Sequence, residues 1–190
     1  MSWILVLALA VGATAPANPQ LAIGLDEHVG AQVPRDLAFT DTTGRLVTLG
    51  SYFDGHRPVI LILAYAHCRM LCSVVLHAVA DAVVASKQAV GRDYLPVIVS
   101  IDPNESPETA RHRQDQLLAE IHHPGERAVW PYLIGDQPTI ARLASTLGFR
   151  YIWDPKTEQF AHPAVVFLLT PRGKVAGPAP CLCTEATSRQ

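Results

Sequence analysis

Residues 58–72 read PVILILAYAHCRMLC, and this stretch decides the fold. Its first part, 58–66, is a continuous apolar run with the length of a strand that is buried on both faces. From Leu71 to Gln88 the apolar residues recur at helical spacing, and Gly91 can end that helix. The chain therefore passes directly from a buried strand into a helix, and Cys68 lies at the junction.

Further strands and helices alternate after this junction. Ser106-Pro107-Glu108 has the residues of a helix start, and Gly148 can stop another helix. This alternation predicts an α/β sheet with parallel pairs, to which a closing hairpin adds antiparallel strands. The expected strands are 95–101, 130–134, 149–153, 164–170 and 174–176, and the expected helices are 107–120 and 136–147.

Two short strand-like runs, 37–40 and 45–49, precede the junction and flank the turn sequence Asp41-Thr42-Thr43-Gly44. The order that follows, β-α-β-α-β-β with a thiol pair after the first buried strand, is that of the thioredoxin fold. We therefore expect a thioredoxin-like α/β domain over 18–176, with a central mixed sheet flanked by helices and an N-terminal β-hairpin extension. Residues 177–190 show no helical period, so we expect an irregular tail and a truncated C-terminal end.

The composition is that of a folded protein, because 49% of the 190 residues are hydrophobic and only 17% are charged. No Lys/Arg cluster provides a nucleic-acid footprint. Residues 3–11 are almost wholly apolar, too short a run to span a bilayer, and small residues follow them. This predicts a signal peptide at 1–17, with an uncleaved membrane anchor as the alternative. We expect a monomer in the periplasm or another extracytoplasmic compartment.

Cys68 and Cys72 are the candidate reactive residues. A helix N-terminus stabilises a thiolate, and Arg69 adds a positive charge beside Cys68. Cys72 lies four residues on, on the same helix face, so the two sulfurs can close a disulfide or bind one metal ion. Two thiolates select Cu(I) over hard cations. The pair predicts a copper site or a redox couple, and two buried structural cysteines are the simpler alternative.

A third copper ligand is expected from the loop before the strand at 164–170, because that loop reaches the helix N-terminus in a thioredoxin fold. The loop reads FAHPA at 160–164, which makes His162 the candidate ligand and a solvated side chain the alternative. Pro163 stands where thioredoxins place a cis-proline that faces the cysteines.

At these residues the chain resembles the SCO/SenC family of copper proteins, which serve cytochrome c oxidase assembly. The resemblance covers roughly 23–176. It implies one copper ion, Cu(I) or Cu(II), on Cys68, Cys72 and His162. It also implies delivery of copper to, or reduction of, the cysteines of the oxidase subunit that holds the binuclear copper centre, and it is compatible with a membrane tether. The motifs are VGAQVPRDLAFTDTTGRLVTLGSYF (29–53), the Cys-x-x-x-Cys segment, Ser100-Ile101-Asp102-Pro103, and His162 before a strand that ends in LTPRG (169–173).

The chain departs from the family pattern at four places. Arg69 replaces the usual proline, Ser106 replaces an aspartate, and Pro163 replaces a small residue, which favours disulfide chemistry. The fourth departure is the tail from Gly177, where the family continues with a strand and a helix. Without that helix, one face of the sheet would be exposed.

Other side chains have weaker claims to a role at the site. Asp102 ends a buried strand at the same sheet edge and could accept a proton, dock a partner or cap the turn. The rest are His67 (an alternative ligand that is expected to point away), His77 (surface), His122 and His123 (adventitious metal binding), and Cys181 and Cys183 (extra copper ligands or incidental thiols).

Two other functions compete with that of a copper-binding assembly factor. In a thiol–disulfide oxidoreductase acting on exported or oxidase-subunit cysteines, Cys68 would be the attacking thiolate and Cys72 the resolving thiol. A thiol peroxidase is disfavoured, because Tyr65 stands where related peroxidases usually place a threonine.

Overall fold

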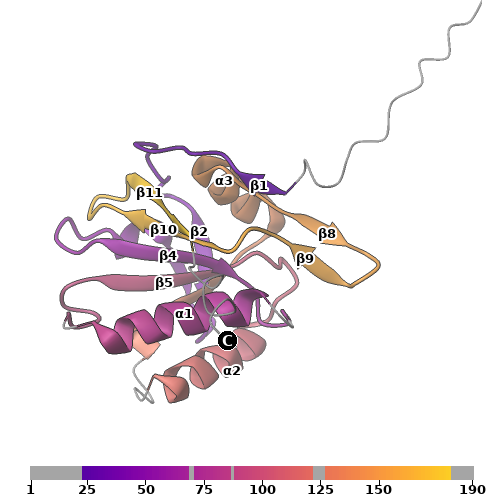
Figure 1. Ribbon diagram of the computed structural model, residues 1–190, viewed down its shortest axis with the longest axis horizontal. Coiled ribbons are helices and arrows are strands. Elements are labelled where there is room, and N and C mark those ends of the chain that lie inside the picture. Colours follow the sequence, from indigo (N-terminus) through magenta and orange to yellow (C-terminus); the bar gives the residue numbers. More distant parts are fainter. Residues whose placement is uncertain (1–22, 69–70, 87, 122–126, 181–190) are drawn as a thin grey trace, which may run out of the picture.

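The computed structural model describes residues 23–68, 71–86, 88–121 and 127–180, and Figure 1 shows their arrangement. A seven-stranded sheet runs in the order β11-β10-β4-β5-β6-β2-β3. The neighbouring strands β4, β5 and β6 are parallel, and all other pairs are antiparallel. The bounds are β2 (Ala38–Asp41), β3 (Leu46–Thr48), β4 (Val59–Ala64), β5 (Leu95–Ser100), β6 (Tyr132–Ile134), β10 (Val165–Leu169) and β11 (Val175–Pro180).

Helices cover the central strands. α1 (Leu71–Ala85) and α2 (Pro107–Glu120) pack against each other, and α3 (Gln137–Leu147) lies apart from them, beside β1 (Gly24–Leu25) (Figure 1). All six residues of β5 are buried and so are five of the six in β4, as expected for parallel strands that are covered on both faces. The predicted thioredoxin-like sheet is confirmed.

The predicted helix ends of α2 and α3 are correct. Ser106 caps α2 by accepting a hydrogen bond from the Thr109 amide at 3.1 Å, and Gly148 ends α3 with a φ of 71°. The helix after the junction ends at Ala85 instead of Gln88. There the Ser86 hydroxyl accepts a hydrogen bond from the Gln88 amide at 3.0 Å, and such a local bond competes with a further helical turn.

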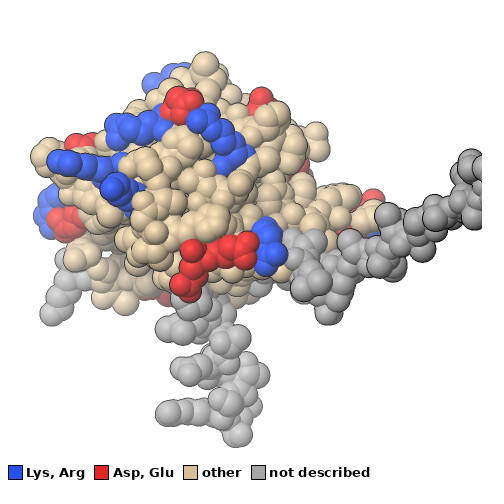
Figure 2. Space-filling view, turned by 90° about the horizontal axis from the view of Figure 1, so that it is seen from above, with Lys and Arg blue, Asp and Glu red and all other residues tan. Residues whose placement is uncertain are grey.

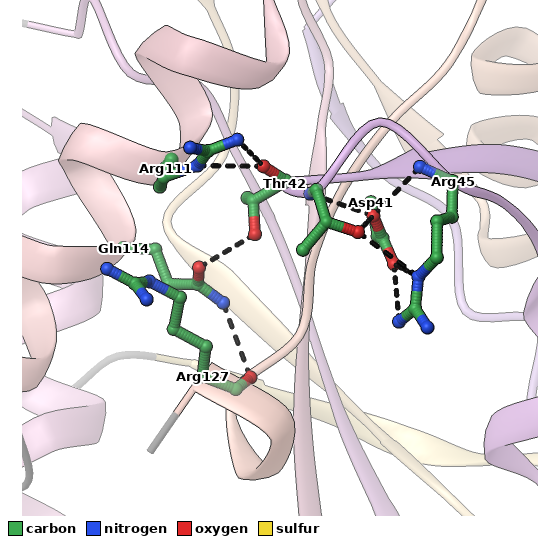
Figure 3. Close-up of polar contacts among 7 residues, drawn as sticks. Asp41, Thr42, Arg45, Arg111, Gln114 and Arg127 are labelled. Carbon is green, nitrogen blue, oxygen red and sulfur yellow. Dashed lines mark hydrogen bonds and ion pairs between the residues drawn. The ribbon is translucent and has the colours of Figure 1, made fainter. Parts of the chain in front are cut away.

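The N-terminal hairpin extends the main sheet, since β2 pairs with both β3 and β6. Figure 3 shows how its turn is anchored on α2. The Thr42 hydroxyl donates to Gln114 Oε1 at 2.9 Å, and Gln114 Nε2 donates to the Trp130 carbonyl at 2.7 Å. Arg111 donates twice to the Thr42 carbonyl. Thr42 and Gln114 are both buried, so this polar network fixes the hairpin in one position.

One predicted strand is wrong, because residues 149–153 do not form a single element. They divide into β7 (Phe149–Arg150), which pairs with β1, and β8 (Ile152–Asp154), which pairs with β9 (Gln159–Ala161) in a separate hairpin. Asp154 makes the turn between β8 and β9, because its carboxylate accepts hydrogen bonds from the Lys156 amide and the Thr157 hydroxyl. The short helical turns are η2 (Leu49–Tyr52) and η3 (Arg127–Val129).

The prediction that the sheet ends at Ala176 is also wrong, because β11 continues to Pro180. The strand lies at the sheet edge, and its two prolines are two residues apart, so both nitrogens lie on one side of it. Proline is tolerated on an edge strand when the missing N–H would face away from the neighbouring strand. Residues 181–190 of the expected tail lie outside the described residues, as does the expected signal peptide.

An apolar groove of about 810 Å³ lies between α1 and the strands β4, β10 and β11. Val79 and Val83 of α1 line one side of it, and Leu168, which is 43% exposed, lines the other. In the part of the chain that the structure describes, the sheet face beside α1 is therefore open, as the sequence led us to expect. On the molecular face drawn in Figure 2, Lys and Arg alternate with Asp and Glu between wide uncharged areas. Among the described helices, none is both long and apolar enough to cross a bilayer.

Candidate functional site

The predicted strand-to-helix junction is present. β4 ends at Ala64, the Cys68 amide donates to the Tyr65 carbonyl at 3.4 Å, and α1 begins at Leu71. Cys68 is half-buried and packs at the margin of the hydrophobic core. Cys72 is the second residue of α1, and its side chain lies outside what the structure describes, as does Arg69. The backbone thus places Cys68 just before a helix, where a thiolate is stabilised.

His162 follows β9 directly and is buried, at 6% exposure, so it is no solvated loop side chain. Its ring lies 5.9 Å from the Phe149 ring and 6.2 Å from the Tyr65 ring, centroid to centroid. Nδ1 lies 3.1 Å from the Pro163 carbonyl oxygen. Since a carbonyl can only accept, Nδ1 carries the proton of this contact and the lone pair is on Nε2. That tautomer is the one in which Nε2 can bind a metal ion.

The segments that carry Cys68 and His162 lie side by side. The Tyr65 hydroxyl donates to Gln159 Oε1 at 2.9 Å and accepts from the Phe160 amide at 3.1 Å. Gln159 Nε2 donates in turn to the His67 carbonyl at 3.4 Å. β9 is therefore bonded to the turn between β4 and α1, and His162 is the first residue after β9. Two of the three predicted ligands, Cys68 and His162, therefore come to the same end of the sheet.

A buried acid that the sequence analysis did not single out contacts the turn at 65–68, which carries Cys68 and is called the cysteine turn below. Glu105 is 7% exposed, and its Oε2 accepts hydrogen bonds from the Ala66 amide at 3.0 Å and the Ser100 hydroxyl at 2.6 Å. Burial raises the pKa of the Glu105 carboxyl, and these two hydrogen bonds oppose the rise. The position of Glu105 just after a buried strand, three residues beyond Asp102, was the signal that could have identified it.

Asp102 itself caps the turn after β5, because its Oδ1 accepts a hydrogen bond from the Asn104 amide at 2.9 Å. Of the two acids it is therefore Glu105 that reaches the cysteine turn. His67 is exposed, and it approaches β9 through its backbone carbonyl. His77 is on the surface, as predicted, where its Nε2 lies 2.8 Å from Glu120 Oε2 of α2.

The remaining sequence predictions have mixed outcomes. No described peptide bond is cis, so the bond before Pro163 is trans. Among the described side chains, no three His, Cys, Asp or Glu residues converge as metal ligands, and the predicted set includes Cys72, whose side chain is not among them. His122, His123, Cys181 and Cys183 lie outside the described residues.

Comparisons with known proteins identify the family and the fold. The family model described as SCO1/SenC matches residues 26–186. Among solved structures, the chain is similar to a protein from Aquifex aeolicus VF5 (TM-score 0.68, 22% identity, 80% of this chain and 84% of that one). It is also similar to Arabidopsis thaliana ScoI with copper bound (TM-score 0.61, 21% identity, 76% and 85%). A third similar structure is BsSco, a member of the Sco family of cytochrome c oxidase assembly proteins in which a disulfide switch was identified (TM-score 0.62, 22% identity, 82% and 86%).

A search of curated proteins found no match. At these identities the solved structures establish the fold, and the family model, which spans most of the chain, establishes the family. The chain belongs to the SCO1/SenC family.

Proposed function

We propose that this chain is a copper-binding assembly factor that holds one copper ion on Cys68, Cys72 and His162 and delivers it to cytochrome c oxidase. The observation that carries the proposal is the position of His162, which is buried and whose strand β9 is bonded to the turn that carries Cys68. Family membership and the copper-bound ScoI structure support it.

The donor atoms fit copper. Two thiolates are soft ligands, which suit Cu(I), and an imidazole also suits copper. The Nδ1 contact with the Pro163 carbonyl fixes the ring of His162 in the tautomer that binds through Nε2. The start of α1 favours the thiolate form of a cysteine that must be deprotonated to bind metal.

A second candidate is a thiol–disulfide oxidoreductase acting on exported or oxidase-subunit cysteines. Cys68 would attack a client disulfide, and Cys72 would resolve the mixed disulfide with release of the reduced client. The half-buried position of Cys68 before a helix favours this role, and the disulfide switch of BsSco supports it. Copper binding and disulfide chemistry would use the same two sulfurs, so the cysteines do not distinguish them. Copper binding would also need His162, and disulfide exchange would not.

A Cu(I) titration of the full reduced chain against a competing chelator tests the proposal. We expect one tightly bound equivalent that involves Cys68, Cys72 and His162. Since loss of a partner of a metal ligand costs about 10–100-fold, loss of a ligand itself in Cys68→Ser, Cys72→Ser or His162→Ala should cost at least about 100-fold. His77→Ala is the matched control, because His77 is an exposed histidine on the same helix as Cys72.

Two results would reject the copper assignment. One is wild-type copper affinity in His162→Ala. The other is weak copper binding by the wild-type chain together with a readily reversible Cys68–Cys72 disulfide, which would favour the oxidoreductase.

We further propose that the chain works outside the cytoplasm, with residues 1–17 as a signal peptide or a membrane anchor. The apolar run at 3–11 supports export. Expression of the full chain in a bacterium, followed by separation of periplasm, membrane and cytoplasm, tests this. Recovery in the cytoplasm alone would contradict it.

A further inference from the structure

Tyr65 contacts three residues of the segment that contains β9 and the candidate ligand: Gln159, Phe160 and His162. It is the first residue after β4 and is 2% exposed. Its hydroxyl uses both its donor and its acceptor capacity on β9, through Gln159 and Phe160. Its ring lies 5.3 Å from the Phe160 ring and 6.2 Å from the His162 ring, in edge-to-face geometry. Tyr65, three residues before Cys68, thus contacts both β9 and His162, the candidate ligand that follows β9.

The β8–β9 hairpin depends on such contacts for its position. It is a two-stranded sheet of its own, and a hairpin of two short strands is marginally stable alone. Its aromatic contact with the turn after β4, between the Phe160 and Tyr65 rings at 5.3 Å, holds it by apolar packing, which has little directionality. The hydrogen bonds of the Tyr65 hydroxyl are directional, so they fix where β9 lies along the cysteine turn.

Any displacement of β9 displaces His162, because the histidine follows Ala161, the last residue of β9. The ring of His162 cannot compensate freely, since it is buried between Tyr65 and Phe149 and its Nδ1 is held by the Pro163 carbonyl. The distance between the Cys68 turn and Nε2 of His162 therefore depends on the Tyr65 hydroxyl.

We propose that Tyr65 is a positioning residue for the metal site: its hydroxyl holds β9, and with it the imidazole of His162, beside the turn that carries Cys68. The inference rests on the proposed function, because it assigns His162 the role of a copper ligand. Phenylalanine at position 65 would keep the ring packing and remove both hydrogen bonds.

The test compares Tyr65→Phe with Tyr94→Phe. Tyr94 is also a buried tyrosine, at 6% exposure, but it precedes β5 at the opposite end of the sheet. Cu(I) affinity should fall about tenfold in Tyr65→Phe, the size of one well-placed hydrogen bond, and stay unchanged in Tyr94→Phe. The thiolate-to-Cu(II) charge-transfer band should also shift in Tyr65→Phe alone. In the metal-free protein, hydrogen exchange of the Phe160 amide should accelerate by at least about tenfold.

The outcomes separate this inference from the proposed function. If His162→Ala loses copper affinity while Tyr65→Phe keeps it and leaves the band in place, the positioning role is refuted and the copper site stands. If His162→Ala binds copper as the wild type does, the proposed function fails, and the positioning role fails with it. If Tyr65→Phe does not fold, Gln159→Ala can replace it, because this variant removes the acceptor of the Tyr65 hydroxyl. Unchanged copper affinity in Gln159→Ala would also overturn the inference.

Discussion

Oε2 of Glu105 accepts a hydrogen bond from the amide of Ala66 at 3.0 Å, two residues before Cys68. The same oxygen accepts from the Ser100 hydroxyl, so one carboxyl ties the end of β5 to the cysteine turn. Burial raises the pKa of Glu105, and the nearby charge of Asp102 adds to the rise, while the hydrogen bonds from Ser100 and Ala66 lower it. The fold therefore contains an acid whose protonated form it favours.

The stability of the protein should fall as the pH rises through the raised pKa of Glu105. A group whose pKa is higher in the folded state contributes stability that is fully present below its unfolded value, here 4.5, and is lost as pH rises through the folded value. Glu105→Gln keeps an acceptor for Ala66 and Ser100 without the titration. We expect its unfolding free energy, relative to wild type, to increase between pH 4.5 and neutral pH in urea denaturation.

The control for this measurement is Glu27→Gln, which changes an exposed glutamate. Its unfolding free energy should follow that of the wild type at every pH. A constant difference between Glu105→Gln and wild type across the pH range would show that Glu105 ionises as readily in the folded state as in the unfolded chain.

Gln114→Ala should destabilise the fold by about 3 kcal/mol, because it leaves the buried Thr42 hydroxyl without the acceptor seen in Figure 3 and the Trp130 carbonyl without its donor. Chemical denaturation measures this directly. Gln116→Ala, on the exposed side of the same helix, should cost less than about 0.5 kcal/mol. Equal losses in the two variants would mean that the hairpin does not depend on the buried network.

Gly148 is required for two reasons, and two variants separate them. Its φ of 71° strains any other residue, and an added Cβ would lie 1.8 Å from the Asp26 carbonyl oxygen. Gly44 has a φ of 84° and nothing within 4 Å of an added Cβ. Gly44→Ala should therefore cost about 1 kcal/mol, and Gly148→Ala clearly more, by thermal or urea unfolding. A loss in Gly148→Ala no larger than in Gly44→Ala would show that the contact with the Asp26 carbonyl relaxes freely.

The predictable part of the fold is the part with long, regular patterns. β4 and β5 were evident as continuous apolar runs, and α2 and α3 from their caps and stops. The β8–β9 hairpin was not evident, because strands of three residues carry almost no alternation. The prediction ended the last strand at Ala176 because no helical period follows it. Whether a proline-containing segment can continue a strand depends on its lying at the sheet edge, which only the finished topology shows.

The site divides in the same way. Residue type and place along the chain were enough to select Cys68 and His162. The hydrogen bond between Tyr65 and Gln159 joins residues 94 positions apart, and it depends on how an unpredicted hairpin packs. Glu105 was missed because its burial follows from the closure of β5 against the cysteine turn, which composition does not reveal.

Cys181 and Cys183 should add to the copper capacity of the chain. Although both lie outside the described residues, Pro180 directly precedes them and pairs with Val165, three residues after His162. The last residue of β11 therefore lies at the end of the sheet where β10 begins and β4 stops, which is the end that carries the candidate site. Thiolates are good Cu(I) ligands. Besides the one tightly bound equivalent, we expect the full chain to bind a second and weaker Cu(I) equivalent, which Cys181→Ser/Cys183→Ser loses while the first remains. If neither the wild type nor the double variant binds a second equivalent, these thiols are incidental. If both bind it, the second equivalent lies elsewhere, and His122 and His123 are the next residues to replace.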